Sequence, residues 1–175
     1  MNQPSYMEMA REARMDFNEY FFLLALDVAK RSTCIRRQVG CIAVRNKRII
    51  ATGYNGAISS MRHCTPDRCY RHKHNIPSGV SLDMCYAVHA EQNVITQAAM
   101  FGTSIKDAEI YITTTPCITC LKLLIQSGVQ CIYALADTYP RNSLIDDIID
   151  EWEGQFSVIT HFNPDCEIGY EIEYD

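Results

Sequence analysis

The segments that decide the fold are His89-Ala90-Glu91 and, further along the chain, Pro116-Cys117-Ile118-Thr119-Cys120. We expect each to begin a helix after a loop or a strand, over residues 88–101 and 116–127. Cys117 and Cys120 are three positions apart, so both sulfurs lie on one helical face and can bind one ion. With His89 as a third ligand, the pattern predicts that the two helix starts adjoin around a metal.

The ligand types point to a catalytic zinc site. Two thiolates and one imidazole leave a fourth tetrahedral position for water, and zinc makes that water a nucleophile near neutral pH. Pro116 suits a first helical position, which does not need its missing N–H. Glu91 is the candidate proton carrier. The alternative for Cys117 and Cys120, a structural zinc knuckle or a redox pair, has no use for that carboxylate.

Composition indicates one globular domain. The chain has 175 residues, of which 47% are apolar and 21% charged, and we expect a single domain over 1–175, with its core over 16–140. The net charge of −5 argues against a general nucleic-acid-binding surface. There is neither a secretory signal nor an apolar run that could span a bilayer, so we expect no membrane partner. Nine cysteines, an odd number, favour metal ligation in a reducing cytoplasm over disulfides.

The remaining sequence alternates between helical and strand patterns. Apolar residues at helical spacing follow Asp16, a candidate cap, from Phe17 to Val28. A hairpin is expected next, over 39–44 and 48–54 with a turn at 46–47. Later strands are expected over 109–114, 130–134 and 156–160, and a helix over 144–152. This alternation predicts an α/β fold with a covered sheet. Residues 141–175 supply the last helix and strand and a tail that fits either an edge strand or a solvated extension.

Residues 56–84 form a long irregular insertion rich in Cys and His. Because so long a structureless loop is unusual in a compact domain, something other than a hydrophobic core should order it. Cys34, Cys64, Cys69 and Cys85 lie in or near this insertion, and four thiolates can close a structural zinc site. The alternatives are free buried thiols, or a histidine in place of one cysteine.

Several residues are candidates for substrate contacts. The amide of Asn55 can bond a sugar hydroxyl or a base edge, although Asn-Gly is also a turn signal. Tyr139 can stack on a base, and a plain surface role fits it equally well. Basic residues gather before and within the insertion, and one or two of them lining the site would hold a single phosphate. They are Arg31, Arg36, Arg37, Arg62, Arg68, Arg71 and Lys73.

These motifs together carry a family resemblance. Gly53-Tyr54-Asn55-Gly56, His63-Cys64, Ile76-Pro77-Ser78-Gly79, His89-Ala90-Glu91-Gln92-Asn93 and Pro116 to Cys120 are similar to those of the deoxycytidylate deaminases of bacteria and their phages. Cys34, Val39-Gly40, Cys69 and Cys85 complete the pattern. The resemblance covers residues 16–140, and the last 35 residues match the family less clearly.

The resemblance implies a cytidine deaminase-like, three-layer α/β/α fold with a mixed five-stranded sheet. It implies hydrolysis of dCMP to dUMP and ammonia, which supplies thymidylate synthesis, with zinc on His89, Cys117 and Cys120 and Glu91 as acid and base. It also implies substrate contacts near Asn55, and we expect Gly56, Ala57 and Ala90 to take part in them. A second zinc, activation by dCTP, inhibition by dTTP and a homo-oligomer (dimer, tetramer or hexamer) are further implications. A phage-encoded member would act in the host cytoplasm.

Other functions remain open. The same chemistry serves dCTP, CMP or a base in RNA or single-stranded DNA, but nucleic-acid substrates call for a basic groove with stacking aromatics, which this acidic chain lacks. A zinc-binding module without catalytic activity is the alternative from another class.

Overall fold

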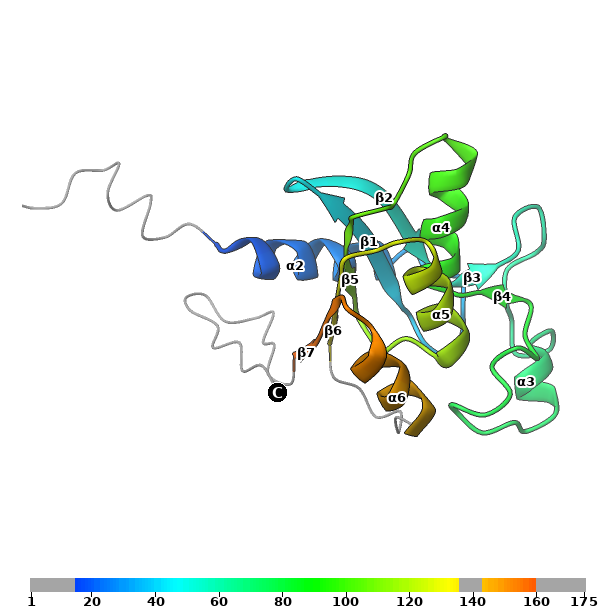
Figure 1. The fold of residues 1–175 in the computed structure, drawn as a ribbon. Coiled ribbons are helices and arrows are strands. Elements are labelled where there is room, and N and C mark those ends of the chain that lie inside the picture. Colours follow the sequence, from blue (N-terminus) through cyan, green and yellow to red (C-terminus); the bar gives the residue numbers. More distant parts are fainter. Residues whose placement is uncertain (1–14, 136–142, 160–175) are drawn as a thin grey trace, which may run out of the picture.

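The computed structural model describes residues 15–135 and 143–159, which form a central sheet with helices on both faces (Figure 1). Its helices are α2 (Phe17–Ala29), α3 (Tyr70–Lys73), α4 (Ala90–Met100), α5 (Ile118–Gln126) and α6 (Ser143–Glu151). Its strands are β1 (Gly40–Arg45), β2 (Arg48–Tyr54), β3 (Gly56–Ala57), β4 (Ala87–Val88), β5 (Glu109–Ile112), β6 (Cys131–Leu135) and β7 (Gln155–Ile159). Within these ranges no helix has the length and hydropathy that crossing a bilayer requires.

The main sheet is mixed. Its strand order is β2-β1-β5-β6-β7, in which β1 runs antiparallel to β2 and β5, whereas β5, β6 and β7 are parallel. Parallel neighbours need a crossover connection, and α5 and α6 lie in the chain between the strands concerned. The prediction of a mixed five-stranded sheet is therefore confirmed.

The hairpin that begins the sheet is also confirmed. Asn46 and Lys47 connect β1 to β2 with φ angles of +52° and +59°. Positive φ at both central residues is typical of the two-residue turn whose twist matches that of the flanking strands.

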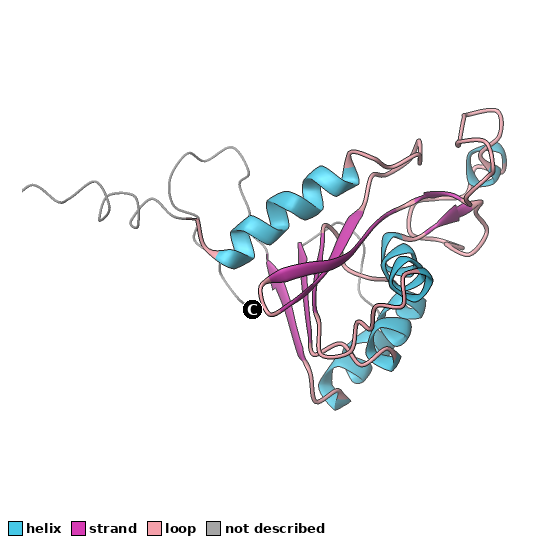
Figure 2. Cartoon of the chain, turned by 90° about the horizontal axis from the view of Figure 1, so that it is seen from above, coloured by secondary structure: helices cyan, strands magenta, loops and turns pink. Residues whose placement is uncertain are grey.

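Helices cover the two faces of the sheet unequally. Figure 2 shows α2 on one side and the other long helices on the opposite side. Under α2, the buried rings of Phe21 and Phe22 pack against Tyr111 of β5, with ring centroids 5.1 and 5.3 Å away. The opposite face carries the larger core, where Val94 of α4 and Leu121 of α5 are fully buried. This arrangement confirms the three-layer α/β/α fold.

Two glycines allow helices to approach the hairpin closely. A Cβ atom on Gly40 would lie 2.0 Å from the backbone oxygen of Ala25 in α2. A Cβ atom on Gly53 would lie 2.3 Å from the backbone oxygen of Ala90 and 2.6 Å from the nitrogen of Val94, both in α4. Gly53 thus fixes how closely the first turn of α4 packs on β2.

Residues 56–84 are more ordered than expected. The segment begins with β3 and contains the short helix α3. Gly56 pairs with Val88 and Ala57 with Ala87, so the two ends of the excursion over 58–86 are adjacent (Figure 1). The prediction of an irregular loop is wrong in this respect, because a two-residue strand and a four-residue helix are too short to produce a detectable period.

Candidate metal centre and active site

His89 precedes the first turn of α4. Its backbone is extended, with φ −74° and ψ 156°, so it occupies the N-cap position. Its backbone N–H donates to the Oε1 atom of Gln92 at 3.0 Å, which satisfies this donor and stabilises the helix start. The imidazole therefore projects from a fixed point at the end of β4.

Cys117 occupies the equivalent position in α5. Its backbone is extended, with φ −70° and ψ 162°, and Cys120 follows within the first turn. Pro116 consequently lies before the cap, which corrects the prediction that it takes the first helical position. The helix starts later than predicted because its first turn closes with the bond from Leu121 N to the carbonyl oxygen of Cys117, at 2.9 Å.

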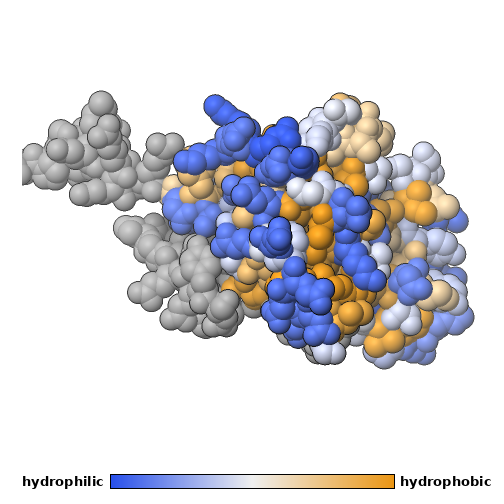
Figure 3. Space-filling model, in the orientation of Figure 1, coloured by the Kyte–Doolittle hydropathy of each residue, from blue (hydrophilic) through white to orange (hydrophobic). Residues whose placement is uncertain are grey.

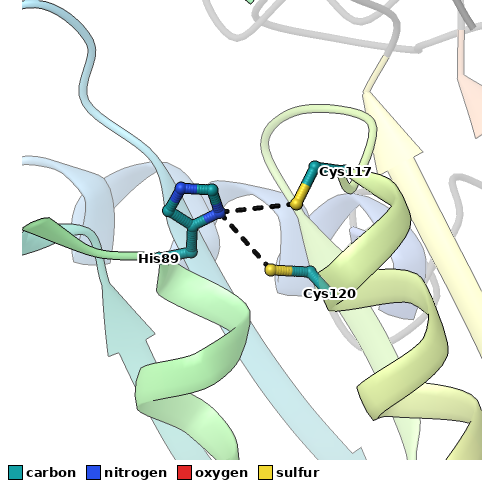
Figure 4. Close-up of side chains that lie close together, drawn as sticks. All are labelled: His89, Cys117 and Cys120. Carbon is teal, nitrogen blue, oxygen red and sulfur yellow. Dashed lines mark hydrogen bonds between the residues drawn. The ribbon is translucent and has the colours of Figure 1, made fainter. Parts of the chain in front are cut away.

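The three predicted ligands converge. The Nδ1 atom of His89 lies 3.6 Å from the Sγ atom of Cys117 and 3.4 Å from that of Cys120 (Figure 4). Among the described residues these three form the one group of potential ligands whose atoms all lie within 4.8 Å of one another. Ligand bonds of about 2.1 Å to nitrogen and 2.3 Å to sulfur on a tetrahedral zinc ion separate N from S by about 3.6 Å. The donor set and its spacing thus fit zinc.

The two thiols are electrostatically unequal. A hydrogen bond from Cys120 is the main cause that lowers the pKa of Cys117, to about 4, and a further bond to His89 acts in the same direction. The pKa of Cys120 is raised, first by that hydrogen bond and then by burial. The lowered pKa of Cys117 favours the thiolate, which is the form that binds a metal ion.

Glu91 lies in the first turn of α4 and is 3% exposed. Burial disfavours its charged form and raises its pKa to about 7, against the opposing effects of a backbone hydrogen bond and of His89. A carboxyl group with a pKa near neutrality can both accept and release a proton, which suits general acid–base work.

A pocket of about 350 Å³ surrounds these groups and includes His89, Glu91 and Cys117 in its wall. Asn55 and Ala90, two of the predicted substrate residues, also line it. Gly56 and Ala57 lie outside the lining. The backbone N–H of Ala57 donates to the hydroxyl of Thr33 at 2.9 Å, so this strand contacts the residue that precedes the pocket-lining Cys34.

Asn55 is buried in a hydrogen-bond network of the protein itself. Its Oδ1 atom accepts from the Ser32 hydroxyl at 2.7 Å and from the backbone N–H of Val39 at 2.8 Å. Its Nδ2 atom donates to the carbonyl oxygen of Arg37 at 2.9 Å. The amide therefore holds two loop segments together at the pocket wall.

The four cysteines of the second cluster line the same pocket. Burial, followed by the charges of Cys34, Cys85 and Cys69, raises the pKa of Cys64, so the four sulfurs are close enough to interact. In the described part of the chain they do not form a group of three or more potential ligands within 4.8 Å of one another, as the residues around His89 do.

Of the seven basic residues considered above, Arg36, Arg37 and Arg71 line the pocket. Tyr139 lies outside the described residues. The sequence analysis missed Thr114, whose hydroxyl is buried at the pocket wall without a hydrogen-bond partner among the described residues. Thr114 follows β5 closely and precedes Pro116 and Cys117, and this position next to the metal ligands could have identified it from the sequence.

A model of the family described as the cytidine and deoxycytidylate deaminase zinc-binding region matches residues 15–136. The chain belongs to this family. ComE operon protein 2 of Bacillus subtilis is 40% identical over 138 residues, which are 79% of this chain and 68% of that protein. The deoxycytidylate deaminase of Schizosaccharomyces pombe is 38% identical over 117 residues, 67% of this chain, but the match spans only 36% of the yeast protein.

The fold comparison agrees with this family membership. The crystal structure of dCMP deaminase from cyanophage S-TIM5, in complex with dCMP and dUMP, superposes with a TM-score of 0.65 and 26% identity. The match covers 83% of this chain and the whole of the cyanophage chain. The cytidine deaminase-like fold of this family member is thereby confirmed.

Proposed function

We propose that this chain is a zinc-dependent deaminase that hydrolyses dCMP to dUMP and ammonia. The observation that carries the proposal is the convergence of His89, Cys117 and Cys120, in a pocket wall that His89 and Cys117 share with the buried carboxyl of Glu91. A cyanophage enzyme with the same fold was solved with dCMP and dUMP, a substrate and its deaminated product, which supports the choice of nucleotide.

His89, Cys117 and Cys120 would hold the zinc ion, which when bound supplies the Lewis acidity that makes water nucleophilic near neutral pH. Glu91 performs the proton transfers. Its carboxylate accepts one proton of the water that attacks C4 and delivers it to N3 of the cytosine ring. It then takes the remaining O–H proton of the tetrahedral intermediate and passes it to the amine, which leaves as ammonia while the C4 carbonyl forms. Burial raises the pKa of Glu91 towards neutrality, which helps one group both to accept and to release a proton.

The substrate contacts are part of the proposal. Asn55 and Ala90 border the bound nucleotide because both line the pocket. Gly56 and Ala57 do not line the pocket; they contact Thr33, and we propose that they hold the segment leading to Cys34 in place. Tyr139 stays a candidate for base stacking.

We propose a second, structural zinc on Cys34, Cys64, Cys69 and Cys85. The charge effects of Cys34, Cys85 and Cys69 on Cys64 support it, since effects of this kind arise among sulfurs that share one region of the pocket. Metal analysis is expected to give about two zinc ions per chain, and Cys64→Ser to lose one of them. A value near one in the unsubstituted protein would rule out this site.

Assembly, regulation and location complete the proposal. At the end of α4, Met100 and Phe101 are each 76% exposed, and a second copy of the chain could cover them. Figure 3 shows hydrophobic side chains reaching the surface between hydrophilic ones on the face it draws.

We propose a homo-oligomer that responds to dCTP and dTTP and acts in the cytoplasm. The free state of the eight described cysteines fits a reducing compartment.

A substrate panel tests the central proposal. Purified protein is incubated with dCMP, CMP, dCTP and a cytosine-containing oligonucleotide, with and without dCTP or dTTP as effectors, while cytosine absorbance and ammonia are followed. We expect dCMP to be consumed fastest. Turnover of the oligonucleotide but not of the mononucleotide would assign the chain to nucleic-acid deamination instead.

A further inference from the structure

Arg71 is a buried arginine in the wall of the active-site pocket. It belongs to α3 and is 7% exposed. Its Nη2 atom donates to the carbonyl oxygens of Pro77 and Val80, at 2.7 and 2.8 Å. The side chain thus holds a segment that itself lines the pocket.

The positive charge of Arg71 is not neutralised by the described part of the chain. Its hydrogen bonds there go to uncharged carbonyl groups, its buried Nε atom has no partner, and no carboxylate lies within ion-pair distance. A buried charge without a counter-ion is costly, and buried guanidinium groups are normally paired. Such a group in a ligand pocket calls for an anion from outside the protein.

Arg36, which is exposed, adds a second positive charge to the same wall. It lines the pocket, and its Nη1 atom donates to the carbonyl oxygen of Ile76 at 2.9 Å. Two arginines therefore hold residues 76–80 through carbonyl groups and concentrate positive charge there, in a chain whose net charge is −5. This local excess is what a small anionic substrate requires.

We propose that Arg71 is the residue that makes the enzyme specific for a nucleotide over a nucleoside, by binding the monophosphate of the substrate. The inference deepens the proposed function and depends on it. A guanidinium group matches phosphate in charge and in the geometry of its donors. Because the same group holds residues 77–80, binding of the phosphate also stabilises this wall of the pocket.

The test compares dCMP with deoxycytidine, which differs only in lacking the phosphate. For Arg71→Gln we expect kcat/KM on dCMP to fall by about 10- to 100-fold, the effect of losing a charge-assisted hydrogen bond. Activity on deoxycytidine should change by less than about threefold. Arg45→Gln is the matched control, since Arg45 also donates to two backbone carbonyls, those of Ser104 and Lys106, but lies outside the pocket.

Equal losses of kcat/KM on both substrates would mean that Arg71 only supports the pocket wall, and this result would overturn the proposal. An unchanged kcat/KM on dCMP would overturn it as well. Arg71→Lys keeps the charge, so it should retain a preference for dCMP even if Arg71→Gln fails to fold; loss of that preference in folded Arg71→Lys would contradict the inference. Calorimetry with dUMP and deoxyuridine makes the same comparison without turnover. It separates a failure of this inference from a failure of the proposed reaction.

Discussion

The imidazole Nδ1 atom of His89 lies 3.6 Å from the sulfur of Cys117, although the two residues are 28 positions apart in the chain. Both are N-cap residues, each with an extended backbone before its helix. The geometry of the metal site is therefore set by where α4 and α5 begin, and substitutions at these two helix starts have predictable effects.

Replacing Glu91 with Gln should separate catalysis from metal binding. Glutamine preserves the volume of the side chain but cannot carry a proton, so turnover of dCMP should fall by about 10²- to 10⁴-fold. Zinc content should stay at the value of the unsubstituted protein, because Glu91 is not a ligand. Absorbance assays with metal analysis check both expectations, and an unchanged rate would remove Glu91 from the mechanism.

The pH dependence of kcat/KM should report the same carboxyl group. Its carboxylate form accepts the proton from water, so activity should rise as the pH rises through the pKa of Glu91 and then level off. That pKa is raised to about 7 by burial, and the charge of a bound zinc ion lowers it. The midpoint of the rise is therefore expected at or below pH 7. A rate that falls with increasing pH over this range would contradict the assignment.

Loss of one sulfur ligand should empty the catalytic metal site. In Cys120→Ser a weakly acidic hydroxyl replaces a thiolate, so we expect the loss of about one zinc ion per chain and of nearly all activity. Cys131→Ala is the control: Cys131 lies in β6, outside the pocket, and this variant should keep both. Retention of all zinc by Cys120→Ser would show that the sulfur is not a ligand.

Two glycine substitutions should distinguish a strained fold from a displaced active site. Gly40→Ala and Gly53→Ala each place a Cβ atom against helix backbone, and overpacking of this kind costs about 1–3 kcal/mol of unfolding free energy. Gly53 contacts the first turn of α4, so its variant should also lower kcat. Gly40 contacts α2, on the opposite face, so its variant should lose stability with little loss of kcat.

Thermal melts and steady-state kinetics on both variants provide the comparison. Equal effects on kcat would mean that the position of α4 on β2 does not control the site.

The sequence predicted those parts of the structure that local patterns determine. The hairpin turn at Asn46 and Lys47 follows from a short-range rule on turns. The convergence of His89 with Cys117 and Cys120 joins distant segments, and the set of ligand types and the family resemblance predict it. In contrast, the hydrogen bonds of Asn55 to Ser32, Val39 and Arg37 join segments that are separate in the chain. No local pattern reveals that this amide is already occupied by the protein.

The insertion was the hardest part to predict for the same reason. The role of Arg71 becomes visible only in the folded chain, where its side chain donates to the carbonyl oxygens of Pro77 and Val80. In the sequence it is one of six arginines that are candidates for holding a phosphate, and only three of these six line the pocket. Pro116 illustrates how uncertain the predicted ends of helices are. The start of α5 is predicted at Pro116 but lies at Ile118, after the cap residue Cys117.

The short pairing of β3 with β4 has an evolutionary consequence. Because the ends of the 58–86 excursion are joined as neighbours, a change in its length need not move the groups on α4 and α5 that perform the reaction. Changes within it would instead alter which ligand the pocket accepts, because Arg71 and the pocket-lining Cys64 and Cys69 belong to it.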